Sequence, residues 1–306
     1  MNSRLPDFFI IGAQKCGTTS LYHWLNQHSD VFMPKLKEPH YFSTIDTTSS
    51  SKFAKTLNII KSHPDYQCLF KNAGTDKIIG EASPSYLWDA SSAEKTNHLL
   101  PRAKIVVSLR DPVERAYSEY LMLIGAGLEN RDFLSAIKFE LSNPNPKWGA
   151  DPMYISLGKY GTQLQHYYNS FHREQIFCIT LDKLANEPQM TMKNIGYFLE
   201  INNTFWNSFE YSKNVKAQGG LARNQLTKIL IGSPVFRSLG RIMVPKSMRQ
   251  YVTQTIMTTK GKKASIGLIE KEVLWDIFEP EIIATERLIG RKLPALWLSH
   301  PDKHIE

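Results

Sequence analysis

The chain has 306 residues, of which 42% are hydrophobic and 22% are charged, and its formal net charge at pH 7 is +8. This length and composition are typical of a globular α/β protein, and no apolar run approaches the ~20 residues needed to cross a bilayer. Three widely spaced cysteines without a C-x-x-C pair argue against a disulfide scaffold or a zinc site and favour a cytoplasmic location.

Strands and helices alternate along the chain. The first strand is expected at Phe8 to Ile11, followed by a loop from Gly12 to Gly17 and a helix from about Thr18 to Gln27. Further strands are predicted at 77–84, 104–112 and 175–184, and helices at 113–124, 131–141, 160–171, 190–201 and 268–290. This alternation predicts an α/β fold with a P-loop-like central parallel sheet, helices on both faces and ligands at the carboxyl ends of the strands. We expect residues 1–306 to form one domain.

Basic residues gather in the last third of the chain. Residues 211–267 contain eleven Lys and Arg and no Asp or Glu. Such a segment suits an anionic ligand, an anionic membrane surface or nucleic acid, or it forms an ordinary solvated face. Within it, residues 212–258 mix basic and apolar side chains, which is typical of a membrane-surface helix and equally of a lid helix packed on the core.

The stretch GAQKCGTTS at residues 12–20 is close to a Walker A loop, G-x-x-x-x-G-K-[ST]. Gly12 and Gly17 have the right spacing, but the lysine is Lys15, inside the loop. Backbone N–H groups at such a turn bind anions wherever the lysine lies. No predicted strand clearly ends in a Walker B aspartate, and Glu81 is the nearest acidic residue. A nucleotide whose reactive group needs a lysine but no metal therefore fits best; a plain strand-to-helix turn is the alternative.

A second candidate anion site lies in VVSLRDPVERAYSEYLM, residues 106–122. Arg110 ends a predicted strand and Ser118 lies on the following helix, for which Asp111 is the expected cap. A phosphate here could contact Arg110, Ser118 and the positive end of the helix dipole. The alternative is an ion pair of Arg110 with Asp111 or Glu114.

Together, G-x-x-K-x-G-T-T-S and L-R-D-P-x-x-R-A-x-S-x-Y resemble the sulfotransferases that use PAPS (3′-phosphoadenosine 5′-phosphosulfate). KEPHYF at 37–42 resembles the heparan sulfate N- and 3-O-sulfotransferase branch, here in a soluble, bacterial-type form. The resemblance implies PAPS as donor, PAP as product and no metal. It implies that the 5′-phosphosulfate is held by Lys15, Cys16, Gly17, Thr18, Thr19 and Ser20. It implies that the 3′-phosphate is held by Arg110 and Ser118, with Lys260, Gly261 and Lys262 as further contacts.

The same resemblance implies the chemistry. Glu38 is the implied base, His40 a second base or acceptor-positioning group, and Lys15 the group that stabilises the leaving phosphate. The alternative reading is an exposed Lys37–Glu38 pair with His40 packed in the core. The implied acceptor is a hydroxyl or amine of a carbohydrate or glycolipid. Thr19 and Ala82 stand where the heparan sulfate enzymes carry further cations, which argues against a heparin-like polyanion.

Residues 212–263 are expected to form a basic, irregular or helical segment that covers the acceptor site, with peripheral contact to the inner membrane surface as an alternative role. Three other functions stay open at this point: sulfation of a hydroxylated small molecule, a P-loop kinase that uses ATP and Mg²⁺, and non-enzymatic binding to an anionic surface. Nucleic acid is not an expected partner, because no recognisable nucleic-acid module is present.

Overall fold

The structure is a computed structural model, and it describes residues 4–45, 57–75, 77–211, 221–222, 258–259 and 266–298. The predicted phosphate contacts Lys260, Gly261 and Lys262 lie outside the described residues, as does most of the segment 212–263.

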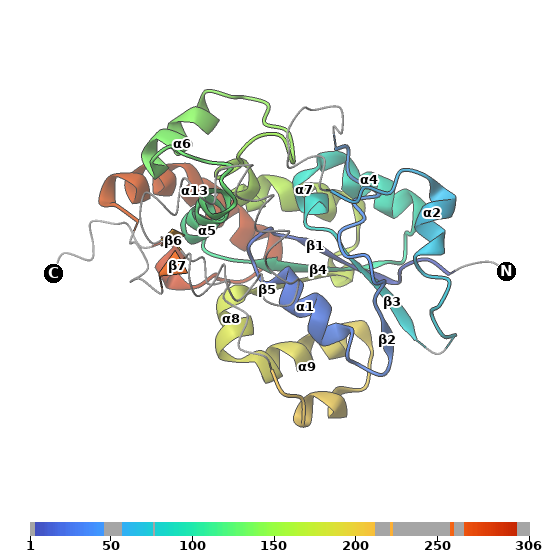
Figure 1. Cartoon of the computed structure of the whole chain (residues 1–306). Helices are drawn as coiled ribbons and strands as arrows, with labels where there is room; N and C mark the ends of the chain where they lie inside the picture. The colour runs from blue at the N-terminus through green and yellow to red at the C-terminus, as the bar shows by residue number, and fades with distance from the viewer. Residues whose placement is uncertain are drawn as a thin grey trace.

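Five parallel strands form the central sheet in the order β2-β3-β1-β4-β5 (Figure 1). Their bounds are β1 Phe8–Gly12, β2 Val31–Phe32, β3 Ile78–Ala82, β4 Lys104–Leu109 and β5 Ile176–Thr180. All five residues of β1 are buried, as expected for a parallel sheet covered on both faces. Because β1 lies between β3 and β4, the segments that follow these three strands meet at one edge of the sheet.

Helices cover both faces of the sheet (Figure 1). One face carries α1 Thr18–Leu25, α8 Leu181–Asn186 and α9 Pro188–Leu199. The other face carries α2 His63–Cys68, α3 Ser85–Trp88, α4 Ala90–Leu99, α5 Pro112–Ala126, α6 Phe133–Leu141, α7 Tyr160–Ser170 and α13 Leu268–Ile289. Short 3₁₀ turns occur at Ser156–Gly158, Arg173–Gln175, Asn203–Asn207 and Ala295–Leu298. Each face has its own hydrophobic core, so the sheet separates two cores.

The predicted α/β fold with a parallel sheet and two helical layers is confirmed. Every strand and helix predicted from the sequence is present, within a few residues of its expected bounds. The sequence did not predict β2, α2, α3 or α4, because β2 has two residues, α2 and α3 are very short, and the sequence of α4 (ASSAEKTNHL) has almost no apolar stripe. It also missed α8, whose first four residues were assigned to the strand at 175–184; the strand ends at Thr180, which caps this helix. It also did not predict the antiparallel pair β6 Leu221–Ala222 and β7 Thr258–Thr259.

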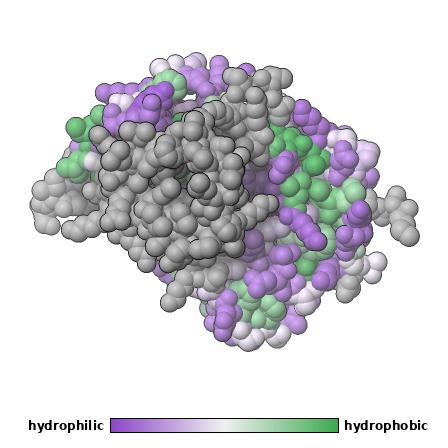
Figure 2. Space-filling model, viewed as in Figure 1, coloured by the Kyte–Doolittle hydropathy of each residue, from purple (hydrophilic) through white to green (hydrophobic). Residues whose placement is uncertain are grey.

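Hydrophilic side chains are interspersed with hydrophobic ones over the described surface on the face that Figure 2 shows. Exposed large apolar residues sit on several separate elements, among them Leu141 on α6, Tyr197 on α9 and Leu268 on α13. In the part of the chain that the structure describes, no helix has both the length and the apolar character that spanning a membrane requires.

Candidate active site

The loop between β1 and α1 has the backbone geometry that an anion-binding turn requires. Leu21 N donates the first helical hydrogen bond, to Gly17 O at 3.1 Å, so the N–H groups of the three preceding residues have no helical acceptor. Gly17 has a φ of 84°, and a Cβ there would lie 2.8 Å from Leu181 Cδ1, so glycine is required at this position. The first turn of α1 contains no acidic residue, which leaves the positive end of its dipole unopposed.

Strand β4 fixes the shape of this loop. Ala13 N donates to Ser108 O at 2.6 Å, and Ser108 Oγ donates to Cys16 O at 2.5 Å. The Cys16 thiol is fully buried 3.6 Å from the Tyr160 hydroxyl, and burial raises its pKa to about 11. The Cys16 side chain is therefore a neutral packing group. Its backbone carbonyl attaches the loop to Ser108 of β4.

Lys15 lies at the crest of the loop, half-buried, with a φ of 68°. Burial lowers its pKa; the nearby Arg115 and Arg110 lower it further, while Glu119 opposes them. Several cations therefore face one small region. This arrangement favours an anion there, because an anion relieves the repulsion between the positive charges.

At the second predicted anion site, Arg110 is already engaged in an ion pair, whereas Ser118 is not. Arg110 follows β4 and its Nη2 donates to Glu114 Oε2 at 3.0 Å, which is the ion pair considered as an alternative. Ser118 is half-buried on α5, and its hydroxyl makes no hydrogen bond to the described residues. Asp111 caps α5, as predicted, by accepting from Val113 N and Glu114 N. Since the cap occupies those N–H groups, a phosphate here meets side chains rather than the helix terminus.

Residues 37–42 cross the carboxyl end of β3, where Glu38 N donates to Ala82 O at 3.0 Å. The Glu38 side chain is 36% exposed; one carboxylate oxygen bonds to Lys37 Nζ, and the other lies 3.9 Å from His40 Nε2. His40 Nδ1 lies 2.7 Å from Ser85 Oγ. The structure thus contains both features of the alternative reading, the Lys37–Glu38 ion pair and the buried His40. The same arrangement places the His40 imidazole beside the Glu38 carboxylate.

His40 is 1% exposed, and its Nε2 has no hydrogen-bond partner among the described residues. Burial lowers the pKa of His40 to about 4, so the ring is neutral at pH 7. The unpaired Nε2 is itself buried and lies 3.9 Å from Glu38 Oε2, so the neutral ring is placed beside the carboxylate and not at an exposed surface.

Left-handed backbone is concentrated at these residues. Four non-glycine residues of the described chain have a positive φ: Lys15 (68°), Glu38 (63°), His40 (55°) and Glu200 (62°). Glu200 ends α9, where this conformation is common. The other three are the predicted catalytic residues, and such strain, on the order of 1–3 kcal/mol per residue, gathers at functional sites.

The sequence did not predict a cavity of about 140 Å³ beside the loop, whose lining includes Gln14, Glu119 and Trp148. Gln14 Nε2 donates to Glu119 Oε1 at 3.2 Å, and burial raises the pKa of Glu119. The Trp148 ring centroid lies 6.2 Å from that of His40 and 5.8 Å from that of Trp88. The cavity therefore lies beside the lysine loop, and Trp148 connects its lining to the buried His40 ring. Two of its lining residues lie within motifs noted in the sequence, Gln14 in the glycine loop and Glu119 next to Ser118, but neither was predicted as a site residue.

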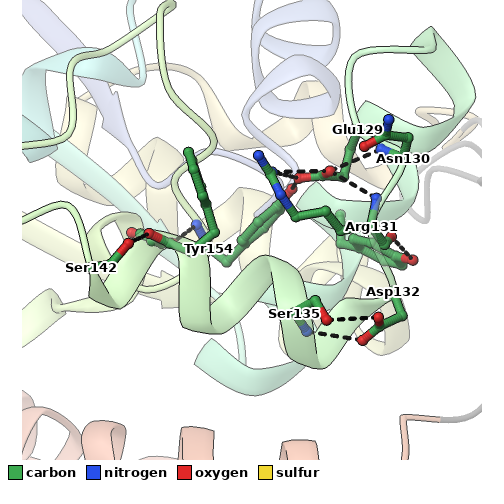
Figure 3. Close-up of polar contacts among 10 residues, drawn as sticks. Glu129, Asn130, Arg131, Asp132, Ser135, Ser142 and Tyr154 are labelled. Carbon is green, nitrogen blue, oxygen red and sulfur yellow. Dashed lines mark hydrogen bonds and ion pairs between the residues drawn. The ribbon is translucent and has the colours of Figure 1, made fainter.

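A fixed scaffold supports the wall of this cavity. Arg115 is fully buried; its Nη2 donates to Met153 O (3.1 Å) and Tyr154 O (2.5 Å), and its Nη1 lies 3.7 Å from Glu119 Oε2. The Tyr154 hydroxyl in turn donates to Glu129 at 2.9 Å, next to the contacts of that carboxylate with Arg131 (Figure 3). Arg115 therefore holds Met153, which lines the cavity, while the Glu129 contacts lie beyond Tyr154, and neither Glu129 nor Tyr154 lines the cavity.

A larger cavity, about 560 Å³, lies at the opposite edge of the sheet, beside the first residues of β1 and β4, Phe8 and Lys104. None of the residues predicted to bind donor or acceptor lines it. The candidate site is therefore the carboxyl edge, as expected for a parallel α/β sheet.

Residues 5–219 match a protein family described as the sulfotransferase domain. The chain is 29% identical over 247 residues to carbohydrate sulfotransferase 15 of Rattus norvegicus, covering 64% of this chain and 44% of the rat protein. It is 29% identical over 204 residues to the bifunctional heparan sulfate N-deacetylase/N-sulfotransferase 1 of Caenorhabditis briggsae, covering 64% of this chain and 23% of that protein. The chain thus spans less than half the length of these relatives.

Among solved structures, a sulfotransferase from Alicyclobacillus acidocaldarius superposes with a TM-score of 0.73 at 25% identity, covering 97% of this chain and all of that one. The glycine loop with Lys15, the Arg110 motif and the Glu38 segment all lie within the matched residues 5–219. Because the family match takes in most of the chain, the protein belongs to the sulfotransferase domain family.

Proposed function

We propose that this protein transfers a sulfuryl group from PAPS to a hydroxyl or amine of a carbohydrate acceptor. The observation that carries the proposal is the arrangement of charges at the carboxyl edge of the sheet. The glycine loop with Lys15 follows β1, a second cationic site with Arg110 follows β4, and Glu38 is held at the end of β3 by the hydrogen bond from its backbone N–H to Ala82 O.

The residues present fit PAPS, which has two separated anionic ends. The N–H groups that open α1 and the half-buried Lys15 suit the 5′-phosphosulfate. Arg110 and the uncommitted Ser118 hydroxyl suit the 3′-phosphate. The two sites belong to neighbouring strands, so one nucleotide can contact both.

Bound PAPS supplies the sulfuryl group and is released as PAP. Glu38 accepts the proton of the acceptor O–H or N–H as the new bond to sulfur forms. Lys15 Nζ and the loop N–H groups stabilise the negative charge that stays on the phosphate oxygen when its bond to sulfur breaks. The buried Nε2 of His40 lies 3.9 Å from Glu38 Oε2, where the neutral ring supports the orientation of this base.

The cavity beside the loop supports a carbohydrate acceptor. Its walls combine the Trp148 ring with the Gln14 amide and the carboxylates of Glu119 and Asp151, and none of its described lining residues is basic. An aromatic face with a few hydrogen-bonding groups suits a neutral sugar ring. The relatives named above are, by name, carbohydrate and heparan sulfate enzymes.

The kinase alternative loses support from the surroundings of Glu81, the nearest candidate for a Walker B carboxylate. This side chain is fully buried, and both of its oxygens accept hydrogen bonds from protein hydroxyl groups. It is directed into the core rather than toward the loop that holds the phosphates in a P-loop kinase.

Thermal unfolding with PAP, compared with ATP plus Mg²⁺, tests the donor. A ligand at 100 times its dissociation constant adds about 2.7 kcal/mol to the free energy of unfolding. We expect this shift with PAP alone and a much smaller one for Lys15→Ala. A shift only with ATP and metal contradicts the proposal and indicates a kinase.

Transfer of ³⁵S from labelled PAPS tests the acceptor class. The probes are chitin oligosaccharides for sugar hydroxyls, de-N-sulfated heparan sulfate for sugar amines, and 2-naphthol for hydroxylated small molecules. We expect label in a carbohydrate. Label only in 2-naphthol contradicts the carbohydrate acceptor and leaves the sulfuryl transfer itself intact.

A further inference from the structure

Glu81 is a fully buried carboxylate to which the proposed reaction assigns no role. It lies in β3, paired with Phe9 of β1, within the larger hydrophobic core. A carboxylate is almost never buried to this extent without partners. Ser83 Oγ donates to its Oε1 at 2.7 Å, and the hydroxyls of Tyr66 and Tyr86 donate to its Oε2 at 3.0 and 2.6 Å.

Each of these three hydroxyl-bearing residues also contacts the segment that carries Glu38. The three contacts reach three successive residues of that segment: Ser83 Oγ accepts from His40 N at 3.1 Å, the Tyr66 ring stacks on Tyr41 with centroids 4.1 Å apart, and the Tyr86 ring packs edge-on against Phe42 at 5.6 Å. One buried carboxylate is therefore linked through a single intermediate to each of three residues in a row.

This segment needs such support, because two of its residues are in an unfavourable backbone conformation. Glu38 and His40 have φ values of 63° and 55°, a region that non-glycine residues rarely occupy. Without anchors, the chain would relax toward more common backbone angles and move the Glu38 carboxylate. The backbone bond from Glu38 N to Ala82 O is one anchor, and the Glu81 contacts supply the others.

We propose that Glu81 is a positioning residue for the sulfuryl transfer: through Ser83, Tyr66 and Tyr86 it holds residues 38–42 in the conformation that presents Glu38 to the acceptor. This inference rests on the proposed role of Glu38 as the base. Glu81 itself is closed off from solvent, so it acts through the segment and not on the substrates.

The titratable groups that face Glu81 are Tyr66 from α2, Tyr86 from α3, Tyr167 from α7 and Glu38. Burial raises the pKa of Glu81 to about 7, and it raises the pKa of all three tyrosines, which stay protonated donors. When Glu81 is ionised, all three hydroxyls donate to it. When it is protonated, its own O–H must be donated, which reverses one of those bonds and loosens the segment.

The test compares Glu81→Gln with Glu129→Gln in the full chain. Glu129 is a matched control, because it is also a buried carboxylate that accepts from a tyrosine hydroxyl, and it lies on the α5–α6 connection (Figure 3). Two quantities are measured: the Kd for PAP, and kcat for PAP release from PAPS with chitin oligosaccharides or water as acceptor, from pH 5.5 to 8.5.

For Glu81→Gln we expect kcat to fall about 10- to 100-fold, as for a small displacement of a catalytic group, with Kd for PAP within about twofold of wild type. The rise of wild-type kcat through the pKa of Glu81, about 7, disappears in this variant and persists in Glu129→Gln. Ser83→Ala removes the hydrogen bonds of Ser83 Oγ with Glu81 and His40 N, leaves the two tyrosine links in place, and lowers kcat by roughly three- to tenfold.

Three results overturn the inference: unchanged kcat in Glu81→Gln, an equal loss in Glu129→Gln, or loss of PAP binding together with kcat. If Glu81→Gln does not fold, Ser83→Ala decides, and normal kcat in that variant overturns the inference. If the wild-type protein does not bind PAP, the proposed function fails and this inference fails with it. If wild type binds PAP and both variants turn over normally, only the role of Glu81 is lost.

Discussion

The two halves of the candidate site are built in opposite ways. The donor half, after β1 and β4, consists of backbone N–H groups and cations, with Lys15 and Arg110 as its charged side chains. The base half, after β3, consists of carboxylates, hydroxyls and aromatic rings around Glu38 and His40. Each half has the chemistry that its proposed ligand requires, because PAPS is a polyanion and the acceptor must lose a proton.

The halves also differ in how they are held. Backbone hydrogen bonds and one serine hydroxyl fix the lysine loop on β4, and these groups follow directly from the strand-to-helix connection. The glutamate segment is fixed by side chains from α2, α3 and β3. Donor binding is therefore expected to tolerate changes in those side chains, and the proton-transfer step is not.

Glu38→Gln gives the largest expected effect on the base half. The amide cannot accept the acceptor's proton, so kcat should fall by about 10² to 10⁴, the usual contribution of a general base. Binding of PAP, measured by calorimetry, should be unchanged. Near-normal turnover would remove Glu38 from the mechanism and assign the base to His40, which His40→Gln would then confirm.

Lys15→Ala removes the cation that the proposed reaction assigns to the leaving phosphate oxygen on the donor half. We expect kcat to fall by about 10² to 10³, by analogy with the loss of an oxyanion donor. Lys71→Ala changes the net charge equally at an exposed site on another part of the surface, and its kcat should match wild type. Similar losses in both variants would mean that overall charge, and not Lys15, acts on the reaction.

Glu81→Gln should change how stability depends on pH. The folded pKa of Glu81, about 7, lies above its ordinary value of 4.5, so the folded state binds its proton more tightly than the unfolded state. The resulting stabilisation is complete below pH 4.5 and is lost as the pH rises to 7, by about 3 kcal/mol for this fully buried group. Urea unfolding at pH 4.5 and pH 8 measures the effect. The free energy of unfolding of the wild type minus that of Glu81→Gln should decrease as the pH rises.

For Glu129→Gln, the stability difference from the wild type should change with pH in the opposite direction in the same experiment. Burial alone would raise the pKa of Glu129, but the N–H groups of Arg131 and Asn130, the Tyr154 hydroxyl and the Arg131 charge together lower it. Its stabilisation is therefore present at neutral pH and lost as the pH falls through the folded pKa. If both variants showed the same sign, Glu81 would not be the titrating group.

Arg110→Ala gives the smallest effect, confined to donor affinity. Losing a charge-assisted hydrogen bond of about 1.5–3 kcal/mol should weaken PAP binding by roughly 10- to 100-fold. Glu114→Ala should act in the opposite direction, because it frees the Arg110 guanidinium from its ion pair. Calorimetry with PAP measures both. Unchanged affinity in Arg110→Ala would place the 3′-phosphate elsewhere.

The sequence by itself determined the fold class and the donor half. Both depend on short stretches: an apolar strand, glycines at 12 and 17, and an Arg110 that directly follows a strand. Residues this close in sequence are placed by one strand-to-turn-to-helix connection, so their spacing predicts their geometry. The capping of α5 by Asp111 was predicted for the same reason and is confirmed.

The tertiary structure decided the base half. Tyr66, Glu81 and Trp148 are far apart in the sequence and give no pattern. Only the packing of α2 and α3 against β3, and of the Trp148 ring beside His40 and Trp88, brings them around residues 38–42. The neutral state of His40 and the raised pKa of Glu81 likewise result from burial. Burial depends on contacts across the whole fold, so the ionisation of these groups cannot be read from neighbouring residues in the chain.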